Sequence, residues 1–287
     1  MNSTEDTQAR SQSWKKSFKT KLLVLGISLF LLGIAFDSFY YEPTHPKTEF
    51  HQFPTKKLKS GQKPLRVIHL SDLHIKTFGK TEQLIVQKVN QQKPDVIALT
   101  GDYVDDSQNL PALKKFLGAL PSSALKFAVL GNIDHLIGVQ PQEFEKIFSE
   151  FGFQLLLNSR VKLQIHSISI CVIGFDDPST GRYDLHAIEN LSRSDFNLLL
   201  AHSPEIYHLI QKGKIDLVLS GHTHGGQIHI PGIPAFWLPR DTRKYGTGFY
   251  KKGKPVMYVN RGIGTSVLPA RFLCPPETAV FDIVPAK

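Results

Sequence analysis

Five short clusters of residues that commonly bind metals recur along the chain, each just after a short apolar run. They are Asp72-Leu73-His74, Gly101-Asp102, Gly131-Asn132, His202 and Gly221-His222-Thr223-His224. Carboxylates, carboxamides and imidazoles are the donors that hard and borderline metal ions take. Because strands that end side by side bring distant residues to one edge of a sheet, the pattern predicts a two-metal hydrolytic site.

The first two clusters carry the carboxylates. Asp72 and His74 are one residue apart, so both can turn toward a common metal, although this spacing also occurs in ordinary polar turns. Asp102 follows Gly101, and glycine permits the sharp turn that directs a carboxylate across the strand ends. Two oxygens can bridge two cations, so Asp102 is the natural shared ligand.

The other clusters supply neutral donors. Asn132 offers a carbonyl oxygen, although it could equally be a turn asparagine, and His202 alone is typical of a core or capping histidine. His222 and His224 give the strongest signal. Two histidines wedged between glycines after a strand contribute little to packing and suit metal binding.

These residues need strands that end at a common edge. From Leu65 the chain alternates apolar strand-like runs with helical patterns, as layered α/β proteins do. Strands are predicted over 65–70, 95–100, 126–130, 168–173, 197–201, 215–220, 255–260 and 279–284. Apolar spacing predicts helices over 81–90 and 141–151, and capping signals predict a helix from Ser203 to Gly213.

The composition indicates one large domain with an extension. Of 287 residues, 41% are hydrophobic and 21% are charged, which excludes a disordered protein. The net charge of +9 favours anionic partners, and phosphate esters, anionic lipids and nucleic acid all qualify. Two cysteines are too few for a disulfide framework, so we expect free thiols.

An apolar segment precedes the predicted domain. After a basic tail over residues 1–21, residues 22–41 are mostly apolar and end in aromatic residues, which predicts a single-pass membrane anchor. A cleaved signal peptide and a membrane-surface helix are the alternatives. The basic residues before the segment weakly favour a domain outside the cytoplasm. Residues 42–63, which contain several prolines, are expected to be a polar linker to a domain over 64–287.

Taken together and in this order, the clusters resemble the calcineurin-like metallophosphoesterases. The resemblance covers about residues 65–284, and residues 259–264 and 271–277 are similar to the membrane-associated or exported bacterial branch of that family. It implies a four-layer α/β sandwich of two mixed β-sheets flanked by helices. With the N-terminal hydrophobic helix, it implies a location at the cell (inner) membrane, single-pass or peripheral.

The resemblance also implies a ligand set for two divalent metal ions. One ion would be held by Asp72, His74, Asp102 and His224, and the other by Asp102, Asn132, His202 and His222. Asp105 resembles the acidic residue of this family that orients a metal ligand without binding the metal itself. Mixed nitrogen and oxygen donors favour Mn, with Fe or Zn as alternatives.

One position departs from the family pattern. Many members have histidine directly after the asparagine, where it assists the leaving group, but this chain has Ile133 there and His135 two residues later. Either His135 takes over that catalytic role or the reaction needs less acid help. A phosphate leaves more readily than an alkoxide, so the loss favours cleavage of a pyrophosphate bond.

The substrate hypothesis follows from these features. A family branch that acts on UDP-2,3-diacylglucosamine, giving lipid X and UMP in lipid A biosynthesis, also lacks this histidine in some members. An exported broad-specificity phosphomonoesterase or phosphodiesterase is the alternative, because the lipid substrate is made on the cytoplasmic face. A binding module with this fold would lack ligands, and none of the seven is missing. No nucleic-acid motif accompanies the basic charge, so no nucleic acid is expected as a partner.

An apolar and basic region over residues 230–254 is a further candidate for lipid contact. It could rest on lipid or cover an acyl chain, or it could be an ordinary surface loop. Its residues of interest are Phe236, Trp237, Arg240, Arg243, Lys244, Lys251 and Lys252.

Overall fold

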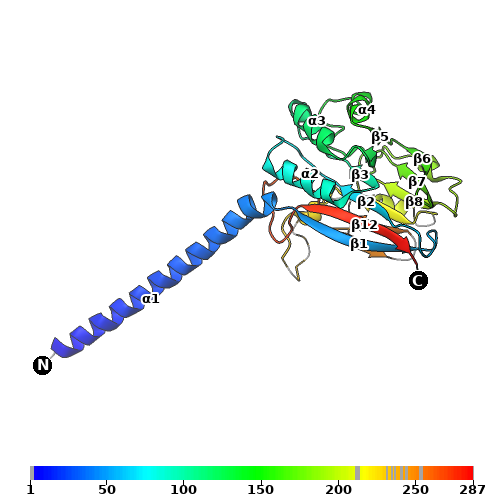
Figure 1. Ribbon diagram of the computed structural model, residues 1–287. Helices are drawn as coiled ribbons and strands as arrows, with labels where there is room; N and C mark the ends of the chain where they lie inside the picture. The colour runs from blue at the N-terminus through cyan, green and yellow to red at the C-terminus, as the bar shows by residue number, and fades with distance from the viewer. Residues whose placement is uncertain are drawn as a thin grey trace.

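A computed structural model shows two six-stranded β-sheets packed face to face, with helices on their outer sides (Figure 1). The structure describes residues 3–210, 214–230, 232–233, 235, 237–239, 242, 245–251 and 255–286. Both sheets mix parallel and antiparallel strands. The predicted fold class is therefore confirmed.

The first sheet holds the earlier strands and the last one. Its order is β1 (Lys47–Thr55), β12 (Glu277–Pro285), β2 (Leu65–Leu70), β3 (Val96–Thr100), β4 (Leu125–Val129) and β5 (Phe153–Leu155). Strands β2 to β5 are parallel, whereas β12 is antiparallel to β2 and parallel to β1. The outer helices are α2 (Lys80–Gln92), α3 (Leu110–Ala119) and α4 (Pro141–Glu150).

The second sheet has a parallel centre and two antiparallel edges. Its order is β10 (Gly248–Lys251), β11 (Val256–Val259), β9 (Leu217–Ser220), β8 (Phe196–Leu200), β7 (Ile168–Gly174) and β6 (Ser159–Ile165). The short helix α5 (Ile206–Leu209) packs on its outer side through Ile206, which shares an apolar cluster with Leu199 and Val218.

Apolar side chains on both faces of the central strands hold the layers together. In β2, Val67 belongs to the cluster between the two sheets, whereas Ile68 belongs to the cluster beneath the outer helices. Alternate residues of a strand point to opposite faces, so a strand buried on both sides needs a continuous apolar run. That requirement explains why the central strands were visible in the sequence. Cys171 and Cys274 are free, as expected, and both are buried.

The expected linker is wrong for residues 47–55, which form strand β1. Pro54 does not exclude a strand there, because β1 lies at the edge of its sheet and one side of its backbone needs no partner. Helix α3 and strands β5, β6 and β10 were also not predicted. The helix after Ser203 is described only as α5, and its predicted end at Gly213 lies outside the described residues.

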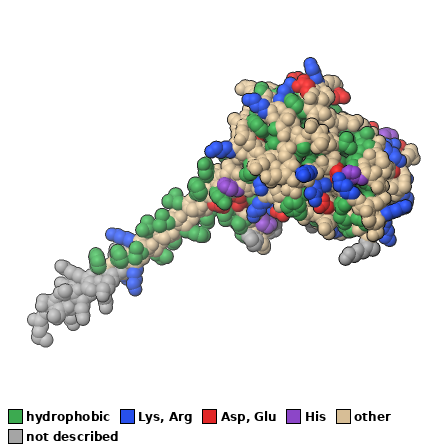
Figure 2. All heavy atoms as spheres, viewed as in Figure 1, with side chains coloured by type: hydrophobic (Ala, Val, Ile, Leu, Met, Phe, Trp, Pro, Cys, Tyr) green, Lys and Arg blue, Asp and Glu red, His purple; other side chains and the backbone are tan. Residues whose placement is uncertain are grey.

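A long helix, α1 (Ser3–Phe36), projects from the domain and contains most of the basic tail as well as the apolar segment. It continues through a π-helical turn, η1 (Asp37–Tyr41), and a 3₁₀ turn, η2 (Glu42–Thr44). Residues Phe18–Thr44 are long and apolar enough to cross a membrane and are almost wholly exposed, and a signal sequence would have the same properties. Figure 2 shows apolar side chains along the half of α1 nearest the domain, with basic side chains beyond them.

Candidate metal centre

The five clusters meet where the strands of both sheets end. The first sheet contributes Asp72 and His74 after β2, Asp102 after β3 and Asn132 after β4, and the second contributes His202 after β8, with His222 and His224 after β9. Their potential ligand atoms form two groups, and within each group these atoms all lie within 4.8 Å of one another. The groups are Asp72 with His74 and His224, and Asp102 with His202 and His222.

Asp102 faces both groups. Its Oδ2 atom lies 3.2 Å from His202 Nε2 and 3.8 Å from His74 Nε2. Asn132 joins the second group, because its Oδ1 atom lies 3.1 Å from His202 Nε2. The structure thus brings all seven expected ligands together, with one carboxylate oxygen between the two groups.

The orientation of the imidazoles fits a bound cation. His202 Nδ1 lies 2.7 Å from the Thr100 carbonyl oxygen, which can only accept, so Nδ1 carries the proton. In the neutral ring Nε2 then carries a lone pair, which faces two oxygen acceptors, Asp102 Oδ2 and Asn132 Oδ1. The lone pairs of these three atoms repel one another unless a cation lies among them or His202 is protonated. The donor set suits a borderline divalent metal ion.

Asp105 fixes His74 in the same way. Its Oδ1 atom lies 2.5 Å from His74 Nδ1, so Nδ1 donates to the carboxylate. The other ring nitrogen, Nε2, faces His224 and lies 3.2 Å from the Nε2 atom of that residue. Partners of this kind set the tautomer of metal-binding histidines. Asp105 therefore has the contact that its expected orienting role requires.

The electrostatics of the centre favour a charged pair of Asp102 and His202. Burial opposes the charged form of His202, yet Asp102 and Asp72 raise its pKa well above the ordinary value. Burial likewise opposes the charged form of Asp102, but His202 and His74 hold its pKa far below the usual range. Burial and the nearby charge of His202 lower the pKa of His222 to about 4. The Asp102 carboxylate is thus held in its charged form, whereas burial raises the pKa of Asp72.

Strained backbone positions the ligands. Asp72, His74, Asp102, His222 and His224 all have positive φ angles, between 42° and 69°. Such angles are uncommon outside glycine and cluster at functional sites, where the surroundings must hold them.

Two glycines allow the loops to approach this closely. Gly101 has φ +87°, and a Cβ atom there would lie 2.5 Å from the Gly131 nitrogen. At Gly221 a Cβ atom would lie 1.8 Å from Ser71 Oγ and 2.2 Å from Asp72 Oδ2. Neither position accepts a side chain without movement of the ligand loops.

Asp134 is a site residue that the sequence analysis missed. Its fully buried carboxylate accepts the backbone N–H groups of Asp102 at 2.8 Å, Tyr103 at 2.9 Å and Gly131 at 2.8 Å. It therefore ties the loop that carries Asp102 to the loop that carries Asn132. Its place two residues after Asn132 was the available signal.

His135 lies against a different loop. Its Nε2 atom is 2.6 Å from Asp176 Oδ1, just after β7, and its side chain is 6% exposed. Ile133 contributes a backbone N–H that donates to Asp102 Oδ1 at 2.9 Å. The position that carries histidine in many family members thus supports the shared ligand through its backbone.

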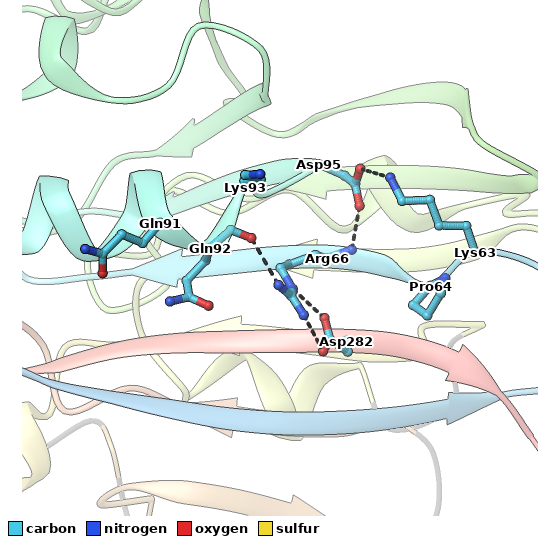
Figure 3. Close-up of a pocket in the computed structure, with 8 residues that line it drawn as sticks. All are labelled: Lys63, Pro64, Arg66, Gln91, Gln92, Lys93, Asp95 and Asp282. Atoms are coloured by element: carbon cyan, nitrogen blue, oxygen red, sulfur yellow. Dashed lines mark hydrogen bonds and ion pairs between the residues drawn. The ribbon is translucent and has the colours of Figure 1, made fainter.

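Two hollows differ in their relation to this centre. One of about 160 Å³ lies beside it and is lined by residues that include Pro43, His74, Lys76 and Thr265. Another, of about 500 Å³, lies at the opposite end of β2, where Arg66 pairs with Asp282 at 2.7 Å (Figure 3). The second hollow is separate from the metal centre.

The apolar and basic region is only partly described. Trp237 is 48% exposed, and Lys251 lies over the Phe249 ring, 4.7 Å from its centroid. The other residues of interest, Phe236, Arg240, Arg243, Lys244 and Lys252, lie outside the described residues.

Comparisons with known proteins agree with this geometry. Residues 65–226 match the family model for calcineurin-like phosphoesterases. The chain is 32% identical over 251 residues to the uncharacterized metallophosphoesterase YkuE of Bacillus subtilis, covering 85% of this chain and 87% of that protein. It is 30% identical over 234 residues to the phosphodiesterase YaeI of Escherichia coli, covering 79% and 84%. A transmembrane protein with a metallophosphoesterase domain from Danio rerio is 31% identical over 243 residues, covering 79% and 54%.

Proposed function

Since the chain belongs to the calcineurin-like phosphoesterase family and is a metal-dependent phosphoesterase, we propose that it hydrolyses a phosphodiester or pyrophosphate bond with two divalent metal ions. The observation that carries the proposal is the position of the Asp102 Oδ2 atom, which faces both groups of potential ligands. A carboxylate in that place suits a bridge between two cations.

Each ion has a distinct ligand set in this proposal. One is held by Asp72, His74, Asp102 and His224, and the other by Asp102, Asn132, His202 and His222. We expect Mn, with Fe or Zn as alternatives. When bound, such a pair activates water and neutralises charge on the phosphoryl oxygens. The protein's part is to hold the donors, through Asp105 behind His74 and the Thr100 carbonyl behind His202.

The leaving group is the second part of the proposal. The Ile133 side chain has no acidic proton to give to a leaving group, and the nearby imidazole of His135 is bonded to Asp176. A bond whose leaving group departs as a stabilised anion needs little acid help, which favours activated diesters and pyrophosphates over alkyl monoesters. The name of the Escherichia coli relative, a phosphodiesterase, agrees with this choice.

Within that class we propose UDP-2,3-diacylglucosamine as the substrate, cleaved to lipid X and UMP, because an apolar helix beside the centre suits an acylated substrate. An exported phosphodiesterase is the alternative, and the charge bias around the helix favours it.

The test compares specificity constants of the full chain, loaded with Mn in detergent, on an alkyl monoester, an aryl diester and UDP-2,3-diacylglucosamine. We expect the diester or the nucleotide lipid to exceed the monoester. Cleavage of the diester alone would establish the alternative, and preference for the monoester would contradict the proposal. Asp102→Ala and His222→Ala should lose turnover yet remain folded, while Asp106→Ala, at an exposed aspartate, serves as the control.

A further inference from the structure

The apolar helix leaves the domain at the edge that carries the metal ligands. Strand β1 is parallel to β12, and β12 is antiparallel to β2, so β1 begins where β2 ends. The helical segment closes at Thr44, and β1 begins at Lys47. Figure 1 shows α1 leaving the domain at this end.

A loop beside the centre is bonded to the end of the helical segment. Arg271 donates its backbone N–H to the Ser38 carbonyl at 2.8 Å, and Leu273 donates to Glu42 Oε2 at 2.8 Å. The fully buried Arg271 guanidinium donates to the carbonyls of Gly262 and Gly264. The loop therefore has a fixed position relative to the helix.

This loop exposes apolar side chains in strained conformations. Val267 is 89% exposed at φ 61°, and Leu273 is 51% exposed at φ 52°. A positive φ is a genuine outlier for a β-branched residue such as valine. Contacts within the described part of the domain do not bury either side chain.

A second loop extends the same surface. Gln227 donates from Nε2 to the Leu268 carbonyl at 2.7 Å, and Ile228 pairs with Phe272. Ile230 is 46% exposed and Ile233 is 54% exposed. The described residues of the two segments, 227–230 with 232–233 and 266–273, thus form one apolar surface beside the helix, and we call them the rim loops.

We propose that the rim loops insert apolar side chains into the surface of a lipid bilayer and hold the metal-bearing edge of the domain against it. The proposal rests on α1 being inserted in that bilayer. Lipid is the occupant because the surface adjoins an exposed apolar helix whose last turns carry Phe39, Tyr40 and Tyr41, residues typical of a membrane interface. Exposed apolar side chains beside such an anchor can enter the boundary between headgroups and acyl chains.

The test measures the depth of one side chain. The full chain is reconstituted into vesicles of phosphatidylethanolamine and phosphatidylglycerol, with an environment-sensitive fluorophore on Val267→Cys. Leu125→Cys is the matched control, because Leu125 is 44% exposed at the start of β4, on the edge away from the ligands. The native cysteines are buried, and labelled wild type gives the background.

We expect lipids with a nitroxide on the acyl chain to quench the label at position 267 several-fold more than at position 125. Equal quenching at both positions would overturn the proposal. A blue-shifted emission at 267 without lipid quenching would also overturn it, because a second copy of the chain would then cover the surface.

Discussion

Single residues decide how firmly the ligand loops are held, and Asp134 is the clearest case. Asp134→Ala would leave three buried backbone N–H groups without their acceptor. Each unsatisfied donor costs about 1–3 kcal/mol, so we expect the free energy of unfolding to fall by several kcal/mol. Denaturant unfolding would measure this, with Glu145→Ala, at an exposed position on α4, as the control. Equal stability of the two variants would refute the role assigned to Asp134.

A glycine pair separates steric crowding from backbone strain. Gly101 and Gly61 have similar φ angles, +87° and +80°, but only at Gly101 would an added Cβ atom have neighbours within 4 Å. Alanine at either position meets an unfavourable backbone, which costs about 1–2 kcal/mol. Gly101→Ala should therefore lower the melting temperature well beyond Gly61→Ala. Similar losses would mean that the ligand loops tolerate the added carbon.

His69 should make stability depend on pH. It is fully buried, its Nε2 lies 2.8 Å from Thr100 Oγ1, and burial lowers its pKa from 6.5 to about 3. Below pH 6.5 the unfolded chain binds a proton that the folded protein excludes. The contribution of neutral His69 to the free energy of unfolding is therefore complete above pH 6.5. It falls by about 1.4 kcal/mol per pH unit as the pH is lowered toward 3.

The measurement compares wild type with His69→Leu by denaturant unfolding at pH 7 and pH 5, with chelator present so that metal binding does not contribute. We expect the wild type to lose more stability between these pH values than the variant. His229→Leu, at an exposed histidine, is the control and should retain the wild-type slope. A wild-type slope in His69→Leu would assign the acid sensitivity to other groups.

At the scale of elements, the sequence was most informative about the buried centre of each sheet. Strand β2 was predicted with its observed bounds because both of its faces are apolar. Strand β1 was missed because an edge strand with one face near solvent has no continuous apolar run. Ligands were recognised from donor type and from their place after strands. Asp134 was not recognised, because its place two residues after Asn132 is a signal only when its bonds to backbone amides are known.

The junction between helix and domain offers another test. The Glu42 carboxylate accepts the N–H groups of Leu273 and Cys274, and Glu42→Ala removes both contacts. We expect faster proteolytic cleavage between α1 and β1, because the segment between them loses its attachment. The rate of appearance of the released domain would show this, with Glu143→Ala, at an exposed position on α4, as the control. Equal cleavage rates would show that other contacts hold the junction.

For the whole molecule, metal binding should stabilise the fold across both sheets. Each ligand group contains residues that follow strands of different sheets, so an ion bound there connects them. A ligand that binds only the folded state at about 100 times its Kd adds about 2.7 kcal/mol. We expect the melting temperature to rise with added Mn and to fall with chelator. Asp102→Ala and His222→Ala should respond less, and an unchanged response in both would exclude these residues as ligands.

The position of β12 has a consequence for synthesis. This strand lies between β1 and β2, and its first residue, Glu277, pairs with Lys47, which comes far earlier in the sequence. While the ribosome is still producing the later strands, β1 has no neighbour and β2 has an open edge, and such edges attract other chains. The first sheet can close only after β12 has been made. Completion of the first sheet therefore waits until β12 has left the ribosome, and a chaperone that shields the open edge of β2 until then would protect the nascent chain.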